Sequence, residues 1–245
     1  MLVRLDKELV RRGLVETRAK AQFLIQSGVI LVNERIVIKQ SYAVHKTDDL
    51  RVVGNPNPWV SRAGLKLEYA IRRFKLGPLD GIALDIGAST GGFTDVLLFY
   101  GCKKVYAVDV GKNQLHNKLK SDGRVVSLER TNAKNLDRLE IPPLDYIVCD
   151  VSFISMQKVL KSSIKFAKNG CKLVSLIKPQ FEVGAASVGK NGIVRNSEYR
   201  VQACKSVTKF LEAEGWVVKG LDQSPITGAD GNIEFLIFAS NKRLG

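Results

Sequence analysis

Charged residues that could move a proton lie at the ends of three apolar stretches of this sequence. Asp150 ends LDYIVCD, Lys178 ends CKLVSLIK, and Glu234 lies in NIEFLIFAS. Short apolar runs of this kind, bounded by turn residues, are typical of buried strands. Carboxylates and a lysine whose pKa is depressed can orient a weak acid, such as a hydroxyl group, and take its proton. We therefore expect a site for acid–base chemistry where these strands end.

A glycine-rich stretch, IALDIGASTGGFTDVLL at 82–98, predicts a strand, a tight turn and a helix that begins near Gly92. Such a turn offers backbone N–H groups to a ligand and lets it approach closely. The spacing differs from the dinucleotide fingerprint G-x-G-x-x-G, because Ser89 stands where the second glycine is expected. A second acid, Asp109, ends the next strand and could bind a ribose diol.

This stretch resembles the first motif of S-adenosylmethionine (SAM) methyltransferases, in which the loop holds the methionine part of the cofactor. The resemblance implies SAM as the cofactor. Asn132 follows a third strand, 125–128, where it could read an adenine edge or be a plain turn residue. The predicted cofactor-binding residues are Asp85, Gly87, Ser89, Thr90, Gly91, Gly92, Asp109 and Asn132.

Strands and helices alternate through most of the chain, which predicts an α/β fold. We expect a Rossmann-like SAM methyltransferase domain, built on a doubly wound and mostly parallel sheet, over residues 62–245. Ligands of such sheets bind at the carboxyl ends of the strands. The expected strands are 82–86, 105–108, 125–128, 144–150, 171–178 and a terminal pair, 216–221 and 232–240, and the expected helices include 62–74, 156–167 and 198–214.

The first sixty residues predict a small α+β domain over 1–54, followed by a linker, 55–61, that contains NPNP. Asp6 could cap a helix over 7–12, and Thr17 could begin a second helix. VILVNERIVIK predicts a hairpin around Asn33 and Glu34, and strands at 42–44 and 50–53 would pair to close a small sheet.

RLDKELVRRGLVETRAKAQFLIQSGVILVNERIV resembles the S4-like RNA-binding module, whose helices and hairpin present a basic face to structured RNA. The alternative is a helical cap with solvated charges. Binding to folded RNA would be mainly to backbone and shape. The predicted RNA-binding residues are Arg4, Lys7, Arg11, Arg12, Arg18 and Lys20.

The composition indicates a globular protein with a polyanionic partner, because the formal net charge is +14 and the pI is near 9.7. No apolar run approaches the ~18 residues that span a bilayer, and MLVRLDKELV is not typical of a signal peptide. The four cysteines lack metal-ligand spacing, so we expect no metal and reduced structural thiols in a cytoplasmic protein. A monomer is favoured.

Three features of the sequence argue against other chemistries. GAASVGKN at 184–191 is close to the phosphate loop G-x-x-x-x-G-K-[ST], but Asn191 lacks the required hydroxyl and GIVRN does not predict a helix. No proline follows Asp150, as it often does in methyltransferases that act on exocyclic amines. Cys149 lies in an apolar strand, unlike an exposed nucleophilic thiol.

With Lys66 from the first helix of the large domain, the charged set is similar to the Lys-Asp-Lys-Glu tetrad of RNA 2′-O-methyltransferases with the FtsJ-like fold. The resemblance implies catalytic roles for Lys66, Asp150, Lys178 and Glu234. We expect Lys178 to be the base and Lys66 to orient the hydroxyl or tune Lys178. Alternatively, all four position the substrate and the proton leaves to water.

The whole chain resembles the TlyA (hemolysin A) family, through LVRRGL, VSRAGLKL, LDIGASTGGFTDVLL, VDVG, LERTNA, DVSFIS, LVSLIKPQFEVG and GNIEF. This implies SAM-dependent 2′-O-methylation of a cytidine in ribosomal RNA or a ribosomal subunit. We expect large-subunit RNA as the target, since the chain ends eleven residues after Glu234. The alternatives are an RNA-binding assembly factor with a non-catalytic SAM fold and, less favoured, a membrane-active hemolysin.

Overall fold

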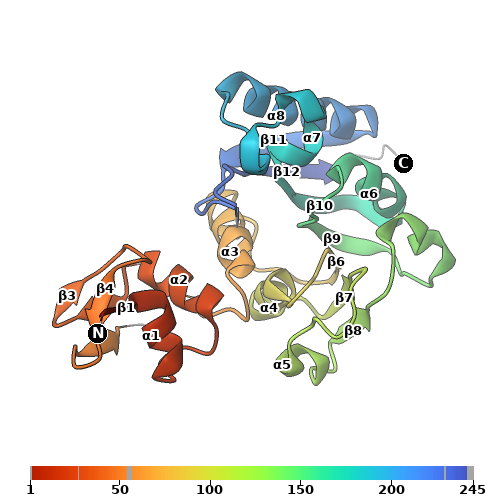
Figure 1. Ribbon diagram of the computed structural model, residues 1–245. Helices are drawn as coiled ribbons and strands as arrows, with labels where there is room; N and C mark the ends of the chain where they lie inside the picture. Colours follow the sequence, from red (N-terminus) through yellow and green to blue (C-terminus); the bar gives the residue numbers. More distant parts are fainter. Residues whose placement is uncertain (1, 27, 54–56, 229, 242–245) are drawn as a thin grey trace. The chain divides into compact units, whose positions relative to one another are not determined.

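The computed structural model describes residues 2–26, 28–53, 57–228 and 230–241. The chain divides into two compact units, Met1–Pro58 and Trp59–Gly245 (Figure 1). Each unit has its own buried apolar side chains, and each is described below by itself.

The first unit contains two short helices and two small antiparallel sheets. The helices are α1 (Leu5–Arg11) and α2 (Arg18–Gln26), and the strands are β1 (Leu2–Arg4), β2 (Ile30–Val32), β3 (Arg35–Ile36), β4 (Ala43–His45) and β5 (Leu50–Val52). Strand β1 pairs with β4, and β2 pairs with both β3 and β5. Leu5, Leu9, Ile25 and Ile30 are fully buried in this unit.

Two predictions for this unit are confirmed. Thr17 caps α2, because its hydroxyl oxygen accepts the backbone N–H of Lys20 at 3.2 Å. Asn33 and Glu34 form the hairpin turn between β2 and β3 with φ of 48° and 65°, the left-handed pair that matches strand twist.

Two other predictions were wrong. The strands near 42–44 and 50–53 do not pair with each other; β4 pairs with the unforeseen β1, while β5 pairs with β2. Asp6 does not cap α1, since the helix begins at Leu5 and Arg4 occupies the cap position without a side-chain bond. Asp6 is instead fully buried. Burial of a carboxylate without charged partners is unfavourable, so its oxygens bond to charged side chains and not to the start of the helix.

The second unit is built on a seven-stranded sheet, as predicted. Its strands are β6 (Ile82–Ile86), β7 (Lys104–Val108), β8 (Val125–Leu128), β9 (Leu144–Cys149), β10 (Ala167–Ile177), β11 (Trp216–Gln223) and β12 (Phe235–Asn241). Their order is β11-β12-β10-β9-β6-β7-β8. Strands β6 to β10 are parallel, and β12 is antiparallel to both β10 and β11.

Helices cover both faces of this sheet (Figure 1). The helices are α3 (Ala63–Arg73), α4 (Gly92–Phe99), α5 (Asn117–Lys120), α6 (Met156–Ser163), α7 (Pro179–Glu182) and α8 (Ser197–Ala213). Along β6, Ala83 packs with residues of α3 and α4, whereas Leu84 and Ile86 pack with residues of α6 and α8. Alternation along each strand therefore supplies two apolar cores, one on each face.

Two boundaries differ from those predicted. Helix α6 ends at Ser163, a 3₁₀ turn follows at Ile164–Phe166, and β10 begins at Ala167, four residues before the predicted start. The predicted linker residues Trp59 and Val60 belong to the second unit. The Trp59 indole donates to Glu68 Oε2 at 2.9 Å, and the Val60 N–H donates to Asp95 Oδ2 at 3.0 Å.

The chain order of the strands reverses between β6 and β9, because β7 and β8 lie on one side of β6 while β10 lies beyond β9. Such a switch point opens a crevice at the carboxyl ends of the strands, where ligands bind in open α/β sheets. In the part of the chain that the structure describes, no helix is long and apolar enough to cross a membrane.

Candidate functional site

The glycine turn after β6 lies against the end of β9. Gly87 has φ of 82°, and a Cβ there would lie 2.6 Å from the backbone oxygen of Asp150. Gly91, with φ of 97°, caps α4, and Gly92 begins this helix. Position 87 therefore requires glycine for two reasons: its positive φ is unfavourable for other residues, and the end of β9 leaves no room for a Cβ atom.

Asp85 supports this turn from below. Its side chain is fully buried, and its Oδ2 accepts the Thr94 hydroxyl at 2.6 Å. Burial raises the pKa of Asp85 to about 7, and the nearby Asp150 and Asp109 carboxylates add to the shift. Among the described residues, Asp85 Oδ1 has no hydrogen-bond partner. Asp85 was predicted to bind the cofactor, but it lines neither of the two cavities described below and lies buried beneath the turn.

Asp109 connects two loops at the mouth of the crevice. Its Oδ2 accepts the Ser89 N–H at 2.8 Å, and its Oδ1 accepts the Gly111 N–H at 2.7 Å. The following loop is held by Glu129, whose pKa is lowered because its carboxylate accepts the backbone N–H groups of 113–115. A carboxylate has lone pairs beyond two bonds, so Asp109 retains capacity to accept from a ligand.

A cleft of 390 Å³ lies beside the glycine turn. Four of the predicted cofactor residues line it: Gly87, Ser89, Asp109 and Asn132. Asn132 also caps a 3₁₀ helix, since its side chain accepts the Lys134 N–H, which agrees with its interpretation as a turn residue, while contact with an adenine edge stays a prediction. Residues that the sequence reasoning missed also line the cleft: Gln114, Thr131, Ser152 and Phe153.

A second cavity, of 220 Å³, adjoins the cleft. The two share Gly87, Ser89, Asp150 and Ser152 among their lining residues. Thr90, a predicted cofactor residue, and Lys178 line the smaller cavity. Together the cavities form a larger and a smaller compartment that meet beside Asp150.

The predicted tetrad is assembled around Asp150, which lines both cavities, while Lys178 lines the smaller one. Lys66 Nζ lies 2.6 Å from Glu234 Oε2 and 3.8 Å from Asp150 Oδ2. Lys178 Nζ lies 2.6 Å from Asp150 Oδ1 and donates to Ser152 Oγ at 2.8 Å. All four side chains are at least 88 % buried, so these ion pairs are largely shielded from solvent screening. Glu234 precedes β12 by one residue.

Phe153 is an unusual residue at the rim of the cleft. Its side chain is 92 % exposed, and its φ of 66° is rare for a bulky residue. Its ring lies 5.6 Å from the ring of Phe181, measured between centroids. Nothing in the local sequence signals a left-handed phenylalanine, which explains why it was missed.

The predicted RNA-binding arginines are largely engaged within the first unit. Arg4 and Arg18 pair with the buried Asp6 at 3.0 and 2.9 Å. These contacts, above all the one with Arg4, lower the pKa of Asp6 well below its usual range.

Glu8 has the same arrangement. Arg11 and Arg12 pair with this buried carboxylate at 2.6 and 2.9 Å. Both arginines, Arg11 foremost, lower the pKa of Glu8 to about 2.

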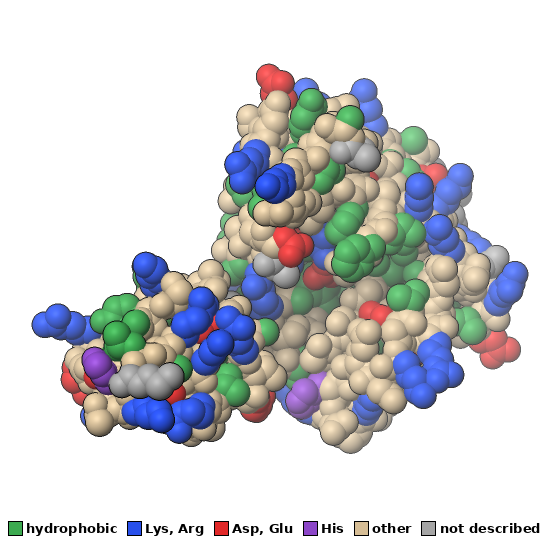
Figure 2. All heavy atoms as spheres, viewed as in Figure 1, with side chains coloured by type: hydrophobic (Ala, Val, Ile, Leu, Met, Phe, Trp, Pro, Cys, Tyr) green, Lys and Arg blue, Asp and Glu red, His purple; other side chains and the backbone are tan. Residues whose placement is uncertain are grey.

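Arg12 is the least exposed of these arginines, and it also donates to the carbonyl oxygens of Asp48 and Lys46, at 2.7 and 2.8 Å, which makes it a structural residue. The two lysines are the remaining candidates. Lys20 forms an exposed pair with Glu16, and the Lys7 side chain is exposed. In Figure 2, Lys and Arg side chains are spread over the visible surface with acids among them.

The sequence motifs that were set aside remain without a role in chemistry. The four cysteines are free and buried, and burial raises the pKa of Cys149 to about 12. Lys190 lies in a 3₁₀ turn that is followed by an extended segment, not by the helix of a phosphate loop. Within the described ranges, no cluster of His, Cys, Asp and Glu could hold a metal ion.

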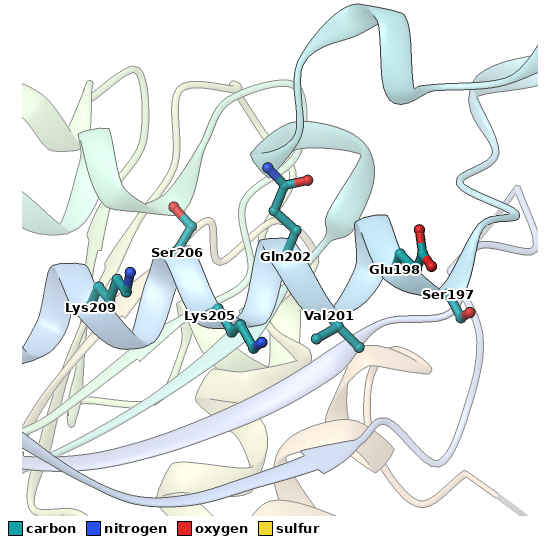
Figure 3. Close-up of a pocket in the computed structure, with 7 residues that line it drawn as sticks. All are labelled: Ser197, Glu198, Val201, Gln202, Lys205, Ser206 and Lys209. Atoms are coloured by element: carbon teal, nitrogen blue, oxygen red, sulfur yellow. The ribbon is translucent and has the colours of Figure 1, made fainter.

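A separate groove of 670 Å³ follows one face of α8 (Figure 3). Its lining residues are Ser197, Glu198, Val201, Gln202, Lys205, Ser206 and Lys209. They all come from one helix, and none is a predicted site residue.

Comparison with known families and proteins gives consistent matches. Residues 59–241 match the FtsJ-like methyltransferase family, and residues 3–50 match the S4 domain. The chain is 45 % identical to hemolysin A of Brachyspira hyodysenteriae over 96 % of this chain and 98 % of the relative.

The names of two further relatives state which nucleoside they methylate. The chain is 41 % identical to the 16S/23S rRNA (cytidine-2′-O)-methyltransferase TlyA of Mycobacterium tuberculosis, over 96 % and 88 % of the two chains. It is 31 % identical to the 23S rRNA (cytidine-2′-O)-methyltransferase TlyA of Campylobacter jejuni, over 94 % and 96 %. A solved structure from Streptococcus thermophilus aligns with a TM-score of 0.76 at 42 % identity, covering 98 % of this chain and 89 % of the other.

Proposed function

Because this chain belongs to the TlyA family of FtsJ-like methyltransferases with an S4 domain, we propose that it methylates the 2′-hydroxyl of a cytidine in large-subunit ribosomal RNA. The observation that carries the proposal is the position of the Lys178–Asp150 pair at the junction of two adjoining cavities, with Lys66 and Glu234 paired beside Asp150. The larger cavity takes the cofactor, and the smaller one admits the hydroxyl group.

The residues of the larger cleft fit SAM. Gly87 leaves room that a Cβ would fill, and Asp109 faces the cleft with unused lone pairs. Asp85 has an unpartnered buried oxygen beneath the turn, and a nearby cationic group would stabilise its carboxylate. When bound, SAM supplies a methyl group that is activated by a positively charged sulfur. Asn132, Thr131 and Gln114 would bound the site on its other side.

Lys178 is the proposed proton acceptor, because it lines the smaller cavity beside Asp150. In the reaction, the ribose oxygen forms a bond to the methyl carbon while the carbon–sulfur bond breaks, and that electron pair stays on sulfur. The hydroxyl proton passes to Lys178, which must have released its own proton to solvent beforehand. Lys66 and Glu234 hold Asp150 and the hydroxyl in line. If all four residues act by positioning, the proton leaves to water.

The target follows from the relatives and the S4 domain. Both TlyA relatives with named activities act on 23S rRNA cytidine ribose, and the S4 domain supplies an RNA-binding module. Phe153 stands exposed at the mouth of the cleft, where an aromatic ring could stack on a base of single-stranded or unpaired RNA.

Purified protein, radiolabelled SAM and ribosomal subunits from a strain without the gene test this function. After digestion to nucleosides, we expect label in 2′-O-methylcytidine from the large subunit. Label in both subunits would correct the choice of subunit, and label on a base would refute the proposed chemistry. Tight RNA binding without label would favour an assembly factor, and lysis of cells by protein with a disrupted SAM site would favour a hemolysin.

A further inference from the structure

Two segments lie next to tetrad residues in the chain: a loop that lines the larger cavity, and a segment that contains α7. They follow the neighbouring strands β9 and β10, and span residues 151–155 and 179–183. Each segment begins directly after a tetrad residue, Asp150 in the first case and Lys178 in the second. The positions of these segments relative to each other therefore affect the positions of the reacting groups.

Glu182, at the end of α7, accepts three hydrogen bonds from the end of the 151–155 loop and the first turn of α6. Its Oε1 accepts the Met156 N–H at 2.7 Å, and its Oε2 accepts the Ser155 hydroxyl at 2.7 Å and Gln157 Nε2 at 3.1 Å. These donors lie at the start of α6, so the carboxylate caps this helix from a different element. Burial raises the pKa of Glu182, while the three hydrogen bonds oppose the shift.

The same two segments are joined again nearer to the tetrad. Lys178 Nζ donates to Ser152 Oγ at 2.8 Å, and the rings of Phe153 and Phe181 lie 5.6 Å apart. Phe153 thus lies between two anchored serines, Ser152 before it and Ser155 after it. A left-handed backbone is unfavourable for phenylalanine and persists only where its surroundings fix it. Its ring is exposed, so this restraint must come from the anchors.

We propose that Glu182 is a positioning residue for methyl transfer, which holds the 151–155 loop so that Ser152 and Phe153 keep their places at the junction of the two cavities. This inference rests on the proposed function, because the RNA substrate is what these residues would face. Glu182 acts through the loop and does not line either cavity.

The test compares Glu182→Ala, Glu182→Gln, Phe153→Ala and the Phe153→Ala, Glu182→Ala double variant. Single-turnover methyl transfer is measured well below the melting temperature, together with SAM affinity. Glu182→Ala is expected to slow the transfer step by about 10-fold to 100-fold, since small misplacements cost this much. SAM affinity is expected to fall by a smaller factor, because the loop supplies only part of the lining of the larger cavity. Glu182→Gln is expected to retain most of the rate, because its amide oxygen still accepts the Met156 N–H.

The double variant separates positioning through the loop from a general loss of structure. If Glu182 acts through Phe153, Glu182→Ala adds little to the defect of Phe153→Ala, which is non-additive behaviour of coupled residues. Glu198→Ala is the matched control, since Glu198 is an acid in the first turn of α8 and lies on the separate groove in Figure 3. Its effect is expected to be negligible and additive.

The proposal would be overturned if the rate defects of Phe153→Ala and Glu182→Ala multiplied in the double variant. It would also be overturned if Glu182→Gln were as slow as Glu182→Ala. Hydrogen exchange of 151–157 provides a readout without RNA: exchange must increase in Glu182→Ala, and unchanged exchange would refute the clamp. If Glu182→Ala does not fold, Ser155→Ala removes one of the three bonds and must produce the same changes to a smaller extent. If hydrogen exchange increases in Glu182→Ala but the wild-type protein does not methylate ribose, the proposed function is refuted and the role of Glu182 in holding the loop is not.

Discussion

Lys66 and Lys178 face different oxygens of the Asp150 carboxylate, at 3.8 Å from Oδ2 and 2.6 Å from Oδ1. Glu234 holds Lys66 at 2.6 Å, so the four charges alternate in sign and sum to zero. Such an arrangement lets buried charges compensate one another. It also means that the loss of one member leaves another charge without a partner.

Lys178→Ala should reduce methyl transfer by about 10²-fold to 10⁴-fold, the usual contribution of a positioned proton acceptor. RNA and SAM binding should change little, because the lysine side chain is a small part of either surface. Single-turnover assays and equilibrium binding measure the two effects. The exposed Lys161 on α6 is the matched control, and Lys161→Ala should keep full activity. Preserved turnover in Lys178→Ala would remove it as the base.

Gly87→Ala should abolish SAM binding and lower the free energy of unfolding. The added Cβ would meet the backbone oxygen of Asp150 at 2.6 Å, and the φ of 82° is unfavourable for alanine. We expect a loss of about 1–3 kcal/mol, measured by denaturant unfolding, with calorimetry for SAM. Gly123→Ala is the control, because no atom lies within 4 Å of its Cβ position. Normal SAM affinity in Gly87→Ala would contradict the assignment of the cleft.

Lys7→Ala with Lys20→Ala tests the S4 domain more cleanly than changes to arginine. These lysines form no ion pair with the buried Asp6 and Glu8, whereas loss of Arg11 or Arg18 would remove one of the ion pairs of these carboxylates. RNA affinity should fall, and the slope of its logarithm against that of salt should decrease by about 1–2, as phosphate contacts release counterions. Arg12→Ala should instead destabilise the unit by about 1–3 kcal/mol through its lost hydrogen bonds. An unchanged slope would mean that these lysines do not contact RNA.

Acid should weaken the first unit through Glu8. The pKa of Glu8 is lowered to about 2, so its ion pairs contribute fully above the unfolded value near 4.5 and are lost as the pH falls toward 2. Glu8→Gln should therefore be less stable than the wild type at pH 7, and the difference should shrink at pH 3. Calorimetric melting of both proteins across this range measures the gap. A constant gap would contradict the role of the ion pairs.

The sequence predicted the sheet of the second unit well, because its strands are continuous apolar runs between turn residues. The 125–128 strand was placed without error, and the tetrad residues come together as the resemblance implied. Strand-end positions are informative in a parallel sheet, since they all meet at one edge.

Other features could not be predicted, for identifiable reasons. Strands β1 and β4 have three residues each, too few for alternation to specify their partner. The burial of Asp6 depends on Arg18 and Gln22, residues in a different helix. Glu182 lies in a motif whose partners are 25 to 27 residues earlier in the chain. Such contacts between elements leave no periodic signal.

Two carboxylates, Asp109 and Asp150, line the proposed cofactor cleft, and a third, Asp85, is buried beneath its glycine turn. Burial, together with the proximity of Asp150 and Asp109, raises the pKa of Asp85 to about 7. Transfer of the methyl group converts a sulfonium into an uncharged thioether. On the proposed function, the electrostatic attraction of these carboxylates for the ligand is therefore stronger before methyl transfer than after it.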